Sequence, residues 1–84
     1  MSDFSKQQKR ILVQRLDSRL NEQVDRLRLG HEAALISIYF ELAEQYPTQE
    51  DLILKRIGDW VADNRCAALK VSIDMLYDLR YQSH

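Results

Sequence analysis

Three arginines, Arg15, Arg19 and Arg26, form the charged group in this chain that most resembles a binding surface. At about 100° per residue of an ideal helix, the three lie within about 40° of one another. Guanidinium groups in such a row could follow a phosphate backbone, which binds them by charge and releases counterions. Glu22 lies in the same row, however, at spacings that allow it to pair with Arg19 and Arg26. The row therefore has two interpretations, a nucleic-acid contact or a solvated face whose charges pair internally, and we favour the second.

An acidic row in the second half of the chain is the counterpart of the arginines. Its carboxylates would share one side of a helix, and the D-x-x-x-D spacing that occurs twice in it can hold a divalent cation. No further ligands accompany them, so we predict no metal site. An acidic row of this kind suits a basic surface on another subunit or protein. Its members are Asp59, Asp63, Asp74 and Asp78.

No set of residues for catalysis is present. The histidines are His31, which has no orienting partner, and His84, the last residue given. The single cysteine, Cys66, excludes an intramolecular disulfide and is typical of a small buried hydrophobic residue. We therefore expect no enzyme, no cofactor and no small-molecule substrate.

Composition and charge place the chain among ordinary globular domains. It has 84 residues, of which 45% are hydrophobic and 30% charged. Residues 1–30 carry a net charge of +3 and residues 31–84 a net charge of −4, an asymmetry that favours an electrostatic partner. The pI of about 6.1 falls short of a dedicated nucleic-acid binder. The longest apolar stretch, at 33–43, is too short to span a bilayer. With no secretory signal visible, we expect a cytoplasmic protein and no membrane contact.

The first forty-six residues have the pattern of an amphipathic helix whose apolar arc becomes wider toward residue 46. An apolar seam at spacings of 3, 4, 4 and 3 indicates contact with one helical neighbour. Gly30 then either ends this helix as a C-terminal cap or is absorbed within it, and we favour one long or kinked helix over residues 5–46. From residue 33 the apolar arc becomes too wide for a single partner helix. The seam residues are Val13, Leu16, Leu20, Val24 and Leu27.

Pro47 supplies the one clear break, and a second helical arm follows it. Thr48 and Asp51 have the spacing of a capping box for that arm. The polar residues 63–65 either end its first helix or only punctuate it. Beyond them two apolar rows run side by side, again too wide for one contact. One row holds Ala68, Val71, Met75 and Leu79, and the other holds Leu69, Ile73 and Leu76.

The sequence thus predicts an all-α fold, an antiparallel helical hairpin with long arms that has breaks near Gly30 and Asn64 as an open alternative. We place a flexible N-terminus at 1–5, a first arm at 6–46, a turn at 47–48 and a second arm at 49–82, all in one domain. Because the apolar arcs exceed what one hairpin can cover, we predict a homodimeric helical bundle. The predicted dimer or partner interface comprises Leu16, Leu20, Val24, Leu27, Tyr39, Phe40, Trp60 and Tyr77.

The stretches "ILKRIGDWV" and "LKVSIDMLYDLRY", about a third of the chain, have a rhythm similar to that of small enterobacterial helical regulators, among them the Hha-like nucleoid modulators. Amphipathic helices in general share this rhythm, so no functional residue is carried over. The predicted function is a non-enzymatic helical interaction protein that regulates or chaperones a protein partner as a homodimer. The alternative is a nucleic-acid-associated transcriptional or nucleoid regulator that uses the basic N-terminal helix.

Overall fold

The computed structural model describes residues 5–82, and these form helices with no strand among them. The predicted all-α class is therefore confirmed. The predicted flexible N-terminus, residues 1–5, lies outside the described residues except for Ser5. The helices are α1 (Lys6–Glu22), α2 (Val24–Arg28), α3 (Glu32–Gln45), α4 (Glu50–Asp63), the 3-10 turn η1 (Ala67–Leu69) and α5 (Lys70–Gln82).

Helix α1 begins at a complete capping box. The Ser5 hydroxyl accepts a hydrogen bond from the backbone N–H of Gln8 at 3.1 Å, and the Gln8 side chain accepts one from the Ser5 N–H at 3.0 Å. Two backbone donors that the first turn leaves without helical partners are thereby satisfied. This local bonding explains why the helix starts here.

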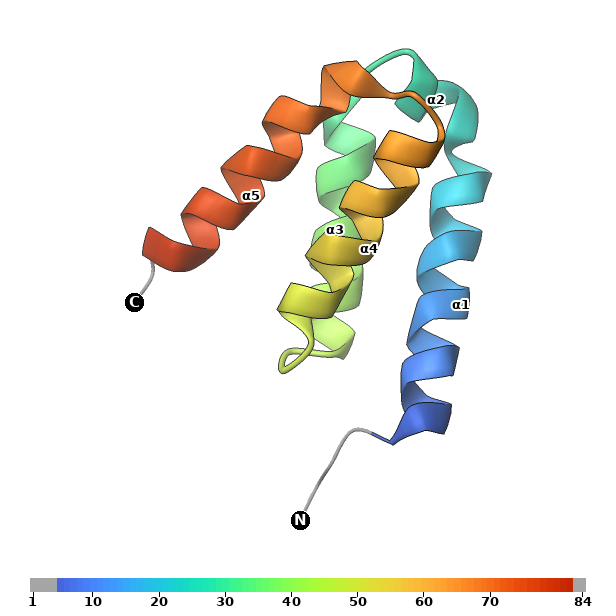
Figure 1. Cartoon of the computed structure of the whole chain (residues 1–84), viewed down its shortest axis with the longest axis vertical. Coiled ribbons are helices and arrows are strands. Elements are labelled where there is room, and N and C mark those ends of the chain that lie inside the picture. Colours follow the sequence, from blue (N-terminus) through green and yellow to red (C-terminus); the bar gives the residue numbers. More distant parts are fainter. Residues whose placement is uncertain (1–4, 83–84) are drawn as a thin grey trace.

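Gly30 ends the first helical segment, so the favoured prediction of one helix over 5–46 is wrong. The N–H groups of Gly30 and His31 donate to the carbonyls of Leu27 and Arg26, at 3.0 and 3.1 Å. These are the two hydrogen bonds of a Schellman motif. Gly30 has φ +80°, a left-handed conformation that glycine adopts without steric cost. The chain therefore reverses here, and α3 runs back alongside α1 (Figure 1).

The same motif, with a less suitable residue, ends α4. Arg65 and Cys66 donate to the carbonyls of Ala62 and Val61 at 3.2 and 2.9 Å. The residue in the left-handed conformation is Arg65, with φ 57°. The polar segment 63–65 thus ends the helix rather than punctuating it, and α5 leaves α4 at an angle (Figure 1).

At these two caps, adding a side chain and removing one should change the free energy of unfolding in opposite directions. Gly30→Ala should lower the free energy of unfolding by about 1–2 kcal/mol, because alanine is strained at positive φ. A Cβ there would lie 3.5 Å from the Ala68 Cβ, an ordinary contact, so backbone strain alone accounts for the loss. Arg65→Gly should raise the free energy of unfolding by about 1 kcal/mol, since it relieves the same strain. Urea denaturation measures both, and equal signs for the two variants would contradict the assignment.

The turn between α3 and α4 lies at Pro47, as predicted, but the predicted capping box does not form. The N-cap of α4 is Gln49, which makes no side-chain cap bond. The Thr48 hydroxyl instead accepts from the Gln49 side-chain amide at 3.3 Å. The helix starts one residue later than the capping pattern requires, which places Thr48 outside the capping position.

Helices α1, α3 and α4 pack against one another, and α5 packs on α3 and α4 (Figure 1). The predicted seam faces this interior: Leu16, Leu20 and Leu27 are at most 1% exposed. Ile53 and Ile57 of α4 are fully buried in the same cluster. The narrow seam of α1 therefore meets helical neighbours from its own chain.

Candidate interaction surface

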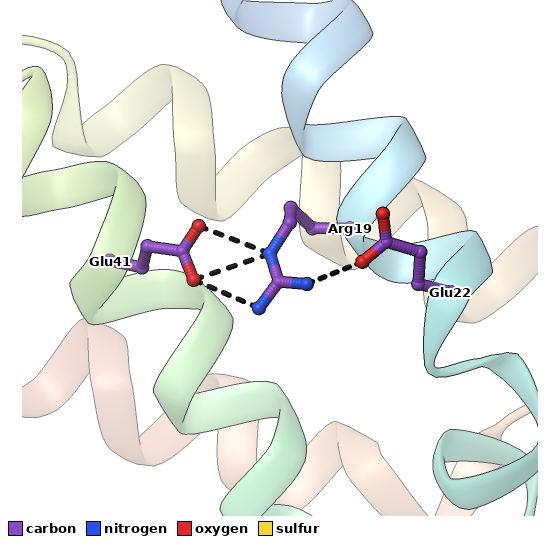
Figure 2. A network of polar contacts seen from close by, with 3 residues as sticks. All are labelled: Arg19, Glu22 and Glu41. Atoms are coloured by element: carbon purple, nitrogen blue, oxygen red, sulfur yellow. Dashed lines mark hydrogen bonds and ion pairs between the residues drawn. The ribbon is translucent and has the colours of Figure 1, made fainter.

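Arg19 joins α1 to α3 and does not stand free for a ligand. Its Nε and Nη2 atoms donate to the Glu41 carboxylate at 2.9–3.2 Å, while Nη1 bonds to Glu22 (Figure 2). These hydrogen bonds, that to Glu41 first, raise the pKa of the Arg19 guanidinium above its ordinary value. Glu22 pairs with Arg19, as the spacing indicated. The partner on α3 could not be found from helical spacing, because it is 22 positions away.

The other two arginines of the predicted row have separate surroundings. Arg15 donates to the Gln45 side chain at 3.2 Å, a second link between α1 and α3. Arg26 is exposed and lines a shallow hollow of about 610 Å³ at the corner between α2 and α3. The helix breaks at Gln23, where φ is −108° and ψ 16°, so Arg26 no longer continues the face of α1. The three arginines do not form one basic strip.

Two further polar links tie α4 to α1. The Arg56 guanidinium donates to both oxygens of Asp17, at 3.0 and 2.8 Å, and this hydrogen bonding raises the pKa of Arg56. The Trp60 indole N–H donates to the Asn21 side-chain oxygen at 3.2 Å. Charged and polar side chains between the helices are thus largely used to hold the single chain together.

The predicted interface residues divide into buried and exposed groups. Tyr39 and Trp60 are 5% and 8% exposed and belong to the core with the three seam leucines, while Val24 and Tyr77 are partly buried against it. Phe40 alone of the predicted set is mostly exposed, at 54%, with its ring edge-on to Tyr39 at 5.1 Å. The buried members have almost no surface to offer a partner in this conformation.

Three of the exposed large apolar side chains that the predicted interface omitted lie together on α5, whereas Ile11 and Leu29 are exposed elsewhere. The two rows of α5 separate: Leu69, Ile73 and Leu76 pack inward, and the other row faces solvent. At about 100° per residue this second row spans about 80° of the helix. We call it the outer row, and it consists of Val71, Met75 and Leu79, which are 63%, 50% and 56% exposed.

A charged edge and a shallow groove border the outer row. Lys70, Asp74 and Asp78 are exposed and follow one another at intervals of four residues, which places them along one edge of the row. Beyond this edge, α4 and α5 form a hollow of about 390 Å³ lined by Gly58, Val61 and Ile73. Gly58 faces open space, since a Cβ built on it would meet nothing within 4 Å. The apolar surface and the edge therefore lie side by side on one part of the molecule.

Residues 5–82 contain neither a cluster of metal-ligating side chains nor a membrane-spanning helix. No group of three or more His, Cys, Asp or Glu side chains in this range is placed to hold a metal ion. Asp59 of the predicted acidic row instead pairs with Lys55 at 3.5 Å. None of the helices described is both long enough and apolar enough to cross a bilayer.

Comparison with known proteins yields no relative. The chain matches no protein-family model, no curated protein and no solved structure. No matched relative therefore supports the similarity of helical rhythm to small helical regulators.

Proposed function

We propose that this chain is a small, non-enzymatic helical interaction protein that regulates or chaperones a protein partner and works as a homodimer. The observation that carries the proposal is the outer row of α5, three large apolar side chains that are each half exposed or more. Apolar residues scattered singly on a surface are ordinary, but a contiguous row on one helix face is typical of an interaction site. Covering the exposed parts of the three would contribute about 3 kcal/mol.

The structure favours this function over nucleic-acid binding. Arg15 and Arg19 already bond to α3, so they would have to leave Gln45 and Glu41 to contact phosphates. Only Arg26 of the predicted row has no bond of this kind among the described residues. One arginine supplies little of the counterion release that drives binding to a nucleic-acid backbone.

Met75→Glu is expected to abolish partner binding without unfolding the chain. It places a charge at the centre of the outer row, where the side chain is half exposed and helical propensity is nearly unchanged. In a tagged pull-down from nuclease-treated lysate of the producing cells, recovery of the partner should fall by about tenfold or more. The melting temperature by circular dichroism should stay close to that of the unmodified protein.

Gln14→Glu is the matched control, because it puts a similar charge on an exposed position of α1. It should recover the same partner as the unmodified chain. Equal recovery by the Met75→Glu variant would contradict the proposal. Loss of all binding on nuclease treatment would favour the nucleic-acid alternative instead.

A further inference from the structure

We propose that the outer row of α5 pairs with the outer row of a second copy of this chain, antiparallel and about a two-fold axis near Met75. The inference rests on the proposed function and assigns the face and the geometry of its homodimer, in which the second copy and the protein partner compete for the same outer row. It follows from the order of apolar and charged residues along α5.

The apolar row is compatible with its own reversal. In an antiparallel two-fold pair the central residue meets its own copy, and residues equally far on either side meet each other. Met75 then packs on the partner's Met75, and Val71 packs on the partner's Leu79. Each apolar side chain of the row, now half exposed or more, acquires an apolar neighbour.

The charged edge is also complementary to its own reversal. A two-fold axis brings like edges together with their order reversed, so Lys70, Asp74 and Asp78 meet the partner's edge in the opposite sequence. Lys70 then faces the partner's Asp78, and this ion pair occurs twice. The cost is a single contact between Asp74 and the partner's Asp74 near the axis. A parallel two-fold pair would instead carry this edge to the opposite side of the contact, away from the partner's Lys70 and Asp78, so neither ion pair would form.

The order of charges on this edge does not stabilise α5 as a single helix. Lys70 is the first residue of the helix, and Asp78 lies one turn before its end at Gln82. The helix dipole favours the opposite order, with acids near the N-terminus and bases near the C-terminus. An antiparallel neighbour reverses the relation, because Lys70 then lies near the C-terminal half of the partner's α5.

The size of the contact predicts a weak dimer. Helix α5 has 13 residues and is about 20 Å long. A contact made mainly by one such helix from each chain is smaller than the roughly 1,600 Å² of a standard interface. Self-association should therefore be reversible and should depend on protein concentration.

A charge exchange tests the antiparallel arrangement directly. Lys70→Asp and Asp78→Lys each replace both ion pairs by like charges and should weaken self-association about tenfold in sedimentation velocity. Both changes move the charge of α5 toward the order that its own dipole favours, so loss of the helix cannot explain the result.

Mixing the two variants one to one should restore the affinity in a heterodimer. The aspartate introduced at position 70 of one variant then faces the lysine introduced at position 78 of the other. The second contact is the original one, between Lys70 and Asp78, so both ion pairs are present again. Isotope labelling of one variant and native mass spectrometry would identify the mixed species.

Three results would overturn the inference. The first is a heterodimer no stronger than either single variant, and the second is dimerisation unaffected by either change. The third is a chain that stays monomeric from about 10 µM to about 1 mM, a range in which even a weak dimer is detected. If that monomer still needs Met75 to capture a protein, the outer row binds a different protein. The proposed regulation or chaperoning of a protein partner then survives, and the homodimer does not.

Discussion

Leu20→Ala is expected to lower the free energy of unfolding by about 3 kcal/mol, because Leu20 is fully buried and its truncation leaves a cavity among α1, α3 and α4. Domains of this size are stabilised by only about 5–10 kcal/mol, so the change removes a large fraction of the total. Urea denaturation at two protein concentrations measures the loss. Since the seam is inside the chain, the loss should be the same at both concentrations.

Leu29→Ala is the matched control, since it removes the same atoms from a side chain that is 77% exposed. Its effect should stay within about 0.5 kcal/mol. A Leu20→Ala variant that is as stable as the control would contradict burial of the seam within the chain. A loss of unfolding free energy that grows on dilution would indicate that the seam is a dimer interface.

Trp60→Ala is expected to lower the free energy of unfolding by about 4 kcal/mol. Trp60 is 8% exposed, its ring belongs to the core, and its indole N–H bonds to Asn21 of α1. Thermal denaturation followed by circular dichroism should show a fall in the melting temperature of well over about 10 °C. The residue thus acts within the chain, and an interface role would require surface that it does not expose.

Trp60→Phe separates the hydrogen bond from the packing. Phenylalanine keeps most of the ring. The variant should lose the unfolding free energy due to the smaller ring and about 1 kcal/mol more, because the Asn21 oxygen loses its hydrogen-bond donor. Asn21→Ala should then cost little in the Trp60→Phe background, a non-additivity that a double-mutant cycle detects. A stable Trp60→Ala variant that fails to bind its partner would instead make Trp60 an interface anchor.

The helical class and most of the core could be predicted from spacing alone. The seam leucines recur at helical intervals, and periodicity reports burial directly. Periodicity does not identify the element that buries them, however. The prediction that the seam of α1 contacts another subunit assumed one helix through Gly30. It therefore did not include the reversal that brings α3 back against the seam.

The two chain reversals show why the break points were harder to predict. Gly30 is a favourable C-terminal cap, but a lone glycine within an apolar phase also fits a long helix, and only the tertiary contacts decide. The polar residues 63–65 indicate a possible helix end, but no local signal identifies Arg65 as the residue in the left-handed conformation, since non-glycine residues seldom adopt positive φ. Its conformation accompanies the reversal that brings α5 back to pack on α3 and α4.

The sequence predicts the apolar rows of the candidate surface but not which row is exposed. The sequence predicts two apolar rows that are together too wide for one contact, and one of them is exposed. Which row faces outward depends on how α5 packs on α3 and α4, which the periodicity of α5 does not contain. The partners of the arginines were missed for a similar reason, because Glu41 and Gln45 are distant from them in the sequence.

A dilution series followed by amide chemical shifts tests most directly whether α5, and not the α1 seam, makes the intermolecular contact. With the chain labelled with nitrogen-15, dilution from about 1 mM to about 10 µM should shift the amides around Val71, Met75 and Leu79. The amides of Leu16 and Leu20 should stay fixed over the same range. Shifts along the seam with α5 unchanged, or no shift anywhere in the series, would contradict pairing through the outer row.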